Sequence, residues 1–202
     1  MNKTEIKEFF DELAPFWDKD QNRNEEVVSL ILEKSGIRKG VSVLDVASGT
    51  GVLFGDYLKL GASVTGIDIS EEMLKIAKEK FPQVNLICED AENFRFSNQY
   101  DVIMIYNAFP HFPNPEMLLG NLTKALKKGG RLTVAHGMSE KELQKCHSGK
   151  AKNISMPLPS KEKLSEMMSV FCDVDVMISD ERMYMVSGRK NKLQIISQTD
   201  TN

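Results

Sequence analysis

Three aspartates follow short apolar stretches that are typical of β-strands, namely Asp45, Asp68 and Asp90. The carboxyl ends of parallel strands meet at one edge of a sheet, where ligands of open α/β folds bind. Carboxylates at this edge can accept hydrogen bonds from ribose hydroxyls or an amine, and they attract cations. A single aspartate after a strand is more often a turn residue or helix cap, so the ordered set of three carries the prediction of a nucleoside site.

The first of these acids leads into a turn of small residues, ASGTG, over positions 47–51. A strand, a glycine turn and a helix together form a device that holds nucleotides. Asp45 would repel the pyrophosphate of a dinucleotide, and Phe54 takes the place of the third glycine of the dinucleotide pattern. A nicotinamide cofactor is therefore disfavoured, and a hydride-transferring oxidoreductase is a distant alternative. S-adenosylmethionine suits Asp45 better, because it has no phosphates and carries a sulfonium and an ammonium group.

The second and third acids have expected partners on the same ligand. Asp68 lies at roughly the 20-residue offset at which an acid accepts the ribose hydroxyls. Ile69 is expected to pack on the adenine, and Asp90 to accept from its exocyclic amine, with Ala91 beside it.

The chain has three histidines, His111, His136 and His147, and each lies at or beyond the carboxyl end of an expected strand. If they share a pocket, they could act as general base for a hydroxyl, thiol or carbon acid, or they could hold a divalent metal with one open position. For each histidine taken alone, a structural role remains the alternative. Four aromatic residues are expected to line an acceptor pocket suited to a small, partly hydrophobic molecule: Phe10, Trp17, Phe109 and Phe112.

The elements that must position these residues alternate between strand and helix along the chain, which predicts a parallel sheet with helices on both faces. Ser70 is expected to cap a helix that stops before Pro82. A second helix is expected to begin after Asn114 as its cap and to end at Gly129-Gly130, followed by a strand over 131–136. Two last strands, over 174–179 and 183–188, are joined by a short acidic turn.

Five segments carry a family resemblance in order: LDVASGTGVL, TGIDIS, CEDAENFRF, YDVIMIYNAFPHF and LKKGGRLTVAH. With the opening FFDELAPFWD, the chain resembles the class I S-adenosylmethionine-dependent methyltransferases over roughly residues 5 to 136. Within that class it is similar to the small-molecule branch that includes the ubiquinone and menaquinone biosynthesis enzymes. Ala47 stands where many members carry glycine.

The resemblance implies a Rossmann-like, seven-stranded, mostly parallel sheet with helices on both faces and an antiparallel C-terminal hairpin. It implies one domain over residues 1–190, with 1–24 as a lid segment over the cofactor, 137–170 as a substrate-side segment, and 191–202 as a polar tail. The implied activity is in-line methyl transfer from S-adenosylmethionine to a small molecule. Asn107 is expected at the methionyl end, and the full set of cofactor contacts is Asp45, Ala47, Gly49, Gly51, Asp68, Ile69, Asp90, Ala91 and Asn107.

Composition agrees with a globular enzyme, since 41% of residues are hydrophobic and 27% charged. Lysine and arginine number 26 against 29 acidic residues, with no basic stripe, so no nucleic-acid partner is expected. No stretch predicts a membrane span or a leader, and the odd number of cysteines, 3, favours reduced thiols, so a cytoplasmic location is expected. The oligomeric state stays open. A non-catalytic sensor or partner subunit that binds S-adenosylmethionine is the main alternative.

Overall fold

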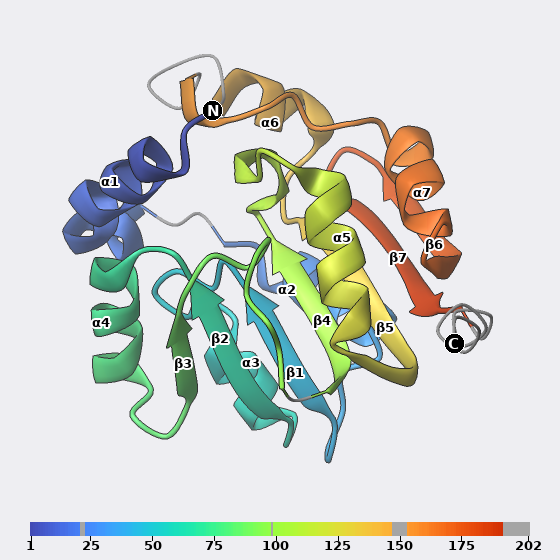
Figure 1. The fold of residues 1–202 in the computed structure, drawn as a ribbon, viewed down its shortest axis with the longest axis horizontal. Helices are drawn as coiled ribbons and strands as arrows, with labels where there is room; N and C mark the ends of the chain where they lie inside the picture. Colours follow the sequence, from blue (N-terminus) through green and yellow to red (C-terminus); the bar gives the residue numbers. More distant parts are fainter. Residues whose placement is uncertain (21–22, 98, 147–152, 192–202) are drawn as a thin grey trace, which may run out of the picture.

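The sheet of this protein has seven strands in the order β3-β2-β1-β4-β5-β7-β6 (Figure 1). The computed structural model describes residues 1–20, 23–97, 99–146 and 153–191. β1 to β5 run parallel to their neighbours, and β7 pairs antiparallel with both β5 and β6. This arrangement confirms the predicted fold class. The strands are β1 (Ser42–Val46), β2 (Ser63–Asp68), β3 (Asn85–Cys88), β4 (Tyr100–Tyr106), β5 (Leu126–His136), β6 (Cys172–Ser179) and β7 (Tyr184–Lys190).

Helices cover both faces of the sheet and form two apolar cores. Buried residues of α2, α3 and α4 pack on one face, and those of α5, α6 and α7 pack on the other. In Figure 1, α5 and α7 lie in front of the sheet, and α2 and α3 lie behind it. The helical elements are α1 (Lys3–Leu13), η1 (Ala14–Asp20), α2 (Glu25–Lys34), α3 (Phe54–Lys59), α4 (Glu71–Lys80), η2 (Phe109–His111), α5 (Pro115–Lys124), α6 (Glu140–Cys146) and α7 (Lys161–Ser169).

Local sequence explains how α4 and α3 are set beside the sheet. The Ser70 hydroxyl accepts from the Met73 N–H at 3.1 Å, as a helix cap does, which confirms the predicted start of α4. Phe54 of α3 is fully buried over Gly66 of β2, where an added Cβ would lie 2.6 Å from the ring. The bulky side chain in place of the third glycine is thus accommodated by a glycine on the neighbouring strand.

Two predictions for the region after β4 were wrong. α5 ends at Lys124 rather than at Gly129-Gly130, and β5 begins at Leu126, whose backbone pairs with Tyr100. The apolar spacing that suggested a longer helix reflects Leu126 entering the core as the first residue of a strand. Asn114 also makes no side-chain cap. Its amide donates to the Glu92 carboxylate at 3.0 Å, and the Glu92 carboxylate accepts the Asn114 N–H.

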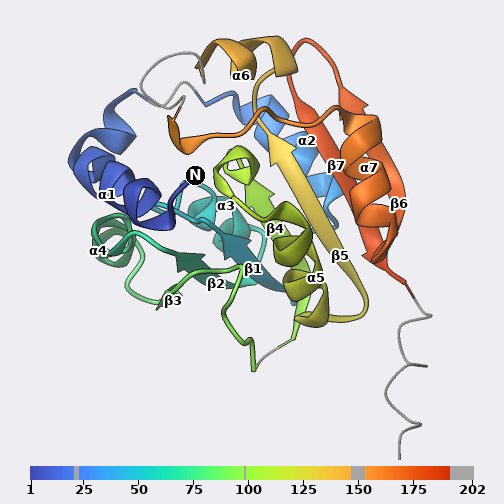
Figure 2. The same cartoon turned by 45° about the horizontal axis from the view of Figure 1, so that its top comes forward.

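The N-terminal elements lie over the edge of the sheet at which the parallel strands end. Figure 1 shows α1 and α6 beyond the tips of β2 and β4, and Figure 2 turns this edge toward the viewer. Within the described residues, no helix combines the length and the apolar character needed to cross a bilayer. The strand ends, their loops and the N-terminal elements together define where a ligand can enter.

Candidate functional site

A cavity of about 510 Å³ lies at this edge, a size typical of small-molecule sites. Its floor comes from the loops after β1, β2, β3 and β4, and α1 and η1 contribute its cover. The polar loops and an apolar cover therefore face the same space. The lining residues are Lys3, Ile6, Phe9, Phe10, Leu13, Trp17, Arg23, Ala47, Ser48, Gly49, Val52, Ile67, Asp68, Ile69, Met73, Glu89, Asp90, Ala91, Tyr106, Asn107, Ala108, His111, Phe112, Pro113, Gly137, Met138 and Leu143.

Asp68 is held by backbone groups at the junction of two loops. One carboxylate oxygen accepts from the Gly49 N–H and the other from the Ser70 N–H, each at 2.8 Å. Burial raises the pKa of this carboxyl to about 6, and the two backbone donors partly offset the rise. The carboxylate is thus fixed in orientation before any ligand arrives, and it lines the cavity.

Asp45 and Gly51 are placed behind the wall of the cavity rather than in it, so far as the described lining shows. Asp45 is only 2% exposed, and burial raises the pKa of its carboxyl to about 8, with the charge of Asp68 adding to the rise. Gly51 has a φ of +80°, and an added Cβ would lie 2.5 Å from the Phe54 ring. Gly51 serves the packing of α3, while the turn itself presents Ala47, Ser48 and Gly49.

The ends of β1 and β4 both pass into left-handed backbone conformations at the cavity. Ala47 has a φ of 53° and Asn107 a φ of 54°. The Asn107 side chain accepts the Gly137 N–H at 2.9 Å, which joins the ends of β4 and β5. Tyr106 fills the space left by the missing side chain of Gly137, where an added Cβ would lie 2.3 Å from its hydroxyl oxygen.

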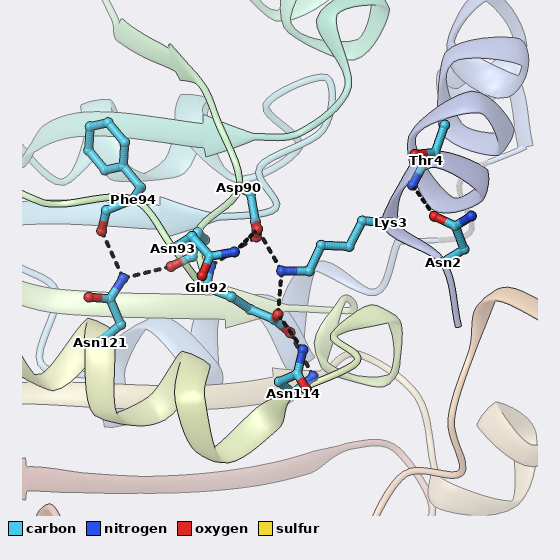
Figure 3. A network of polar contacts seen from close by, with 10 residues as sticks. Asn2, Lys3, Thr4, Asp90, Glu92, Asn93, Phe94, Asn114 and Asn121 are labelled. Carbon is cyan, nitrogen blue, oxygen red and sulfur yellow. Dashed lines mark hydrogen bonds and ion pairs between the residues drawn. The ribbon is translucent and has the colours of Figure 1, made fainter.

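Asp90 lies at the end of the cavity that β3 provides, and it is paired with a lysine from α1. Figure 3 shows Lys3 reaching between two carboxylates, with its ammonium 2.6 Å from Asp90 and 2.5 Å from Glu92. Burial lowers the pKa of Lys3, but its hydrogen bonds to the two acids outweigh burial and raise the pKa above its ordinary value. The lysine is therefore a cation that offsets one of the two negative charges at this corner of the cavity.

Two further anchors from the N-terminal segment reach the other two loops. Asp11 accepts from the Ser70 hydroxyl at 2.6 Å, next to Asp68. Asp18 accepts from the Thr50 hydroxyl at 2.6 Å, in the turn after β1. The segment is thus tied to each of the three loops that follow β1, β2 and β3.

Arg23 and Lys3 are lining residues that the sequence analysis did not identify. Arg23 donates to the Val52 carbonyl and to Asp56, each at 2.6 Å, so its guanidinium is fixed beside the start of α3. It lies close enough to Tyr106 to influence the pKa of that phenol. Both cations belong to the segment 1–24, which was predicted to cover the site. The available signal for them was that basic residues in this segment would face the acidic loops.

The three histidines have different surroundings. His111 lines the cavity, and its Nδ1 lies 2.9 Å from the Ile154 carbonyl oxygen, with the Phe10 ring packed edge-on at 5.0 Å. His136 is fully buried in contact with the Tyr184 ring and is not part of the described cavity wall. His147 lies outside the described residues.

The predicted metal site is not formed by the part of the chain that the structure describes. Within these residues, no group of three His, Cys, Asp or Glu side chains could hold a metal ion. His136 is directed into the core rather than to the cavity that His111 lines, so these two do not converge on one ion.

The aromatic residues expected to line an acceptor pocket divide in the same way. Phe10, Trp17 and Phe112 line the cavity, and Phe10 packs edge-on against Trp17 at 5.6 Å. Phe109 is 2% exposed and belongs to the core beneath α5, outside the described cavity wall. Its buried side chain anchors η2 in the core, and this short helix places His111 and the following Phe112 at the cavity.

Comparisons with known proteins agree with this geometry. Residues 43–130 match a family model described as a methyltransferase domain. A demethylmenaquinone methyltransferase of Renibacterium salmoninarum is 31% identical over an alignment of 137 residues, which covers 65% of this chain and 58% of that protein. A ubiquinone biosynthesis O-methyltransferase of Coxiella burnetii is 30% identical over an alignment of 142 residues, which covers 65% of this chain and 61% of that protein. The matches thus span less than two thirds of the relatives' own length.

Solved structures show the same fold at lower identity. A Haloferax volcanii methyltransferase, in complex with the Trm112 methyltransferase activator, has a TM-score of 0.76 at 18% identity, covering 90% of this chain and 97% of that one. Magnesium protoporphyrin IX methyltransferase from Synechocystis PCC 6803, with bound S-adenosylhomocysteine, has a TM-score of 0.72 at 16% identity, covering 94% and 100%. Residues 43–130 therefore match a methyltransferase domain, and the chain resembles the class I S-adenosylmethionine-dependent methyltransferases of quinone biosynthesis in sequence and shares the fold of this class.

Proposed function

We propose that this protein transfers the methyl group of S-adenosylmethionine to a small, largely apolar acceptor. The observation that carries the proposal is one cavity in which the acid-bearing loops after β2 and β3 and the small-residue turn after β1 face an apolar cover and His111. The loops match what a cationic nucleoside needs, and the cover matches a small hydrophobic molecule. Because α1 and η1 lie across this edge of the sheet, we propose a small molecule and not a polymer as the acceptor.

The cofactor's adenosine is proposed to lie along the ends of β2 and β3. Asp68 would accept the ribose hydroxyls, and Ile69 and Ala91 would flank the adenine. Asp90 would accept the exocyclic amine. β2 and β3 are neighbours in the sheet, so the residues that follow them lie side by side in the cavity wall.

The methionyl part is proposed to lie beside the turn after β1 and the end of β4. Ala47, Gly49 and Asn107 line that end. Arg23 is a fixed guanidinium in the same wall and would pair with the cofactor's carboxylate. Asp45, behind the wall, would favour the positive charge of the cofactor once ionised.

When bound, the cofactor would supply a methyl group that is already activated by its positively charged sulfur. Most of the rate acceleration would therefore come from holding the acceptor close to that group. The chain's own task is to orient the acceptor and to take its proton. His111 is the candidate base: when Nδ1–H donates to the Ile154 carbonyl, the lone pair is on Nε2. We assign no role to a metal, since the described donor groups do not fit one.

Calorimetric titration of metal-free protein tests the cofactor assignment. We expect binding of S-adenosylmethionine and S-adenosylhomocysteine, no binding of NADH, and a loss of at least about tenfold in affinity for Asp68→Ala, because the ribose loses its acceptor. Absence of binding to the wild-type protein would overturn the proposal. NADH binding would support the oxidoreductase alternative instead.

Arg23→Met tests the placement of the methionyl end. Its affinity for S-adenosylhomocysteine should fall about tenfold, whereas its affinity for 5′-methylthioadenosine, which lacks the amino-acid carboxylate, should not change. Equal losses for both ligands would show that Arg23 acts on the fold and not on the carboxylate.

Turnover separates the enzyme from the non-catalytic alternative. Methyl transfer from labelled cofactor to a panel of phenols, quinols and thiols should be detectable, and His111→Gln should reduce kcat by about a hundredfold or more while cofactor affinity is kept. Cofactor binding with no transfer to any member of such a panel would favour a sensor or partner subunit. Unchanged turnover in His111→Gln would remove the proposed base.

A further inference from the structure

The contact between Lys3 and two carboxylates can open without dismantling the loop that carries them (Figure 3). Asp90 keeps the Glu92 N–H at 3.0 Å and the Asn93 amide at 2.6 Å. Glu92 keeps the backbone N–H of Asn114 at 2.8 Å and its amide at 3.0 Å. Both acids are therefore oriented by neutral donors, and the lysine is an additional, separable partner.

Few buried apolar residues hold the helix that carries Lys3, and another polar anchor is the hydrogen bond from Ser70 to Asp11 near its C-terminal end. Ile6 is the buried residue of α1, whereas four residues of the similarly long α2 are buried. Phe9, Phe10 and Leu13 of α1 face the cavity instead of a packed core. Their burial depends on what fills the cavity, so docking of α1 and occupancy of the cavity must favour each other.

The position of the lysine links this docking to one end of the ligand. Lys3, Glu89, Asp90 and Ala91 line the same end of the cavity, after β3. The Lys3 side chain is 28% exposed, and the Glu92 side chain with which it pairs is fully buried. An ion pair in this partly buried position is screened less than a surface pair.

We propose that Lys3 is a latch: its ion pairs with Asp90 and Glu92 hold the N-terminal segment closed over the adenine end of the cofactor and set how long the spent cofactor stays bound. Lys3 acts through Asp90 and is a positioning residue, not a catalytic one. The inference rests on the proposed cofactor site and adds the element that controls entry and exit.

The chain contains one tryptophan, and it reports on this segment. Trp17 belongs to η1 and lines the cavity, and its Nε1 would lie 3.9 Å from a Cβ added to Gly49. Stopped-flow quenching of Trp17 therefore gives association and dissociation rates without a label. The ligands are S-adenosylhomocysteine and 5′-methylthioadenosine, which share the adenosine.

The variants are Lys3→Met, Lys3→Arg and a matched control, Lys75→Met, which removes the same charge from an exposed pair with Glu72 on α4. We expect Lys3→Met to raise the dissociation rate of both ligands about tenfold, and Lys3→Arg to return it to within about twofold of wild type. Lys75→Met should dissociate at the wild-type rate. Salt should raise the wild-type dissociation rate of 5′-methylthioadenosine, which lacks the carboxylate assigned to Arg23, and have little effect on the same rate in Lys3→Met.

A Lys3→Met protein that releases both ligands at the wild-type rate would overturn the latch, even if its melting temperature has dropped, because the lysine would then be structural only. A wild-type dissociation rate independent of salt would also overturn it, and this measurement needs no variant. No binding of either ligand by the wild-type protein would instead refute the proposed cofactor site, from which the latch follows.

Discussion

Ala47 adopts a backbone conformation that L side chains rarely take, at the point where β1 delivers the chain into the cavity. A left-handed residue with a Cβ is strained by about 1–2 kcal/mol, and glycine avoids the strain. Such strain is retained where the surrounding structure determines it, and cavity walls are among those places. The alanine methyl group is thus held in the cavity wall at the expense of stability.

Ala47→Gly should therefore raise the free energy of unfolding by about 0.5–1 kcal/mol, since relief of strain exceeds the added entropy of the unfolded chain. Urea unfolding measures the change. Ala108→Gly is the matched control, because Ala108 also lines the cavity but has a φ of −130°. That variant should be less stable than wild type. If both variants are less stable than wild type, backbone strain at Ala47 does not lower the free energy of unfolding as proposed.

Asp45 predicts a pH dependence of stability. Burial raises its pKa to about 8, so between pH 4 and 8 the folded protein keeps a proton that the unfolded chain has released. The contribution of this group to stability therefore falls as the pH rises through that window. Asp45→Asn removes the titration and should gain stability relative to wild type as the pH rises, by at least about 1 kcal/mol at pH 8.

Thermal unfolding of both proteins at pH 5 and pH 8, without ligand, measures this difference. A constant difference between the two proteins across the window would mean that Asp45 is ionised in the folded state throughout. Addition of the cationic cofactor should reduce the difference, because a nearby positive charge lowers the pKa of the carboxyl.

At the scale of elements, the contact between α3 and β2 depends on one glycine. A Cβ on Gly66 would lie 2.6 Å from the Phe54 ring and 2.7 Å from the Ser48 hydroxyl, both of which are buried. Gly66→Ala should therefore cost about 1–3 kcal/mol of folding free energy through overpacking. It should also weaken cofactor binding, because Ser48 lines the cavity.

Gly55→Ala, in α3 beside Phe54, provides the control for Gly66→Ala. An added Cβ there would meet only the Phe81 ring at 3.8 Å, an ordinary contact. Alanine is favoured over glycine in a helix by about 1 kcal/mol, so this variant should be at least as stable as wild type. Chemical denaturation of the two variants compares them. A loss in Gly55→Ala as large as that in Gly66→Ala would contradict the packing argument.

The sequence predicted these elements where local chemistry decides them. Ser70 caps α4, and the three apolar runs that lead into acids form the parallel strands β1, β2 and β3. The prediction that a helix continues to Gly129-Gly130 failed because Leu126 suits a helix face and a buried strand equally well. Only its pairing with Tyr100 decides between the two. Lys3 escaped notice for a related reason: its partner Asp90 is 87 positions away, and a lysine on an amphipathic helix is usually a solvated residue.

The site was predicted best where it consists of backbone turns and least where it depends on packing. Asp68, Ala47 and Gly49 line the cavity as expected from strand ends meeting at one edge. His136 faces the core because alternate side chains of a strand point to opposite sides of the sheet, and residue spacing alone does not fix which side the cavity occupies. Phe109 faces the core because it begins the short helix η2, whose turn the sequence analysis did not predict.

At the scale of the whole molecule, stability should be lowest in the N-terminal cover. Amide hydrogens of α1 should exchange faster than those of α2, because fewer buried apolar residues hold α1. S-adenosylhomocysteine should slow exchange in α1 and leave α7, on the other side of β5, unchanged. Hydrogen exchange followed by mass spectrometry measures both helices in one experiment. Equal protection of α1 and α2 without ligand would mean that the cover is an integral part of the core.

The position of β7 has a consequence for how the chain is made. This strand is the last in chain order, yet it lies inside the sheet between β5 and β6. During synthesis, β5 and β6 must therefore wait with unpaired edges until residues Tyr184–Lys190 have emerged from the ribosome. The sheet can be completed only after β7 has been synthesised, and until then a chaperone has two open strand edges to protect.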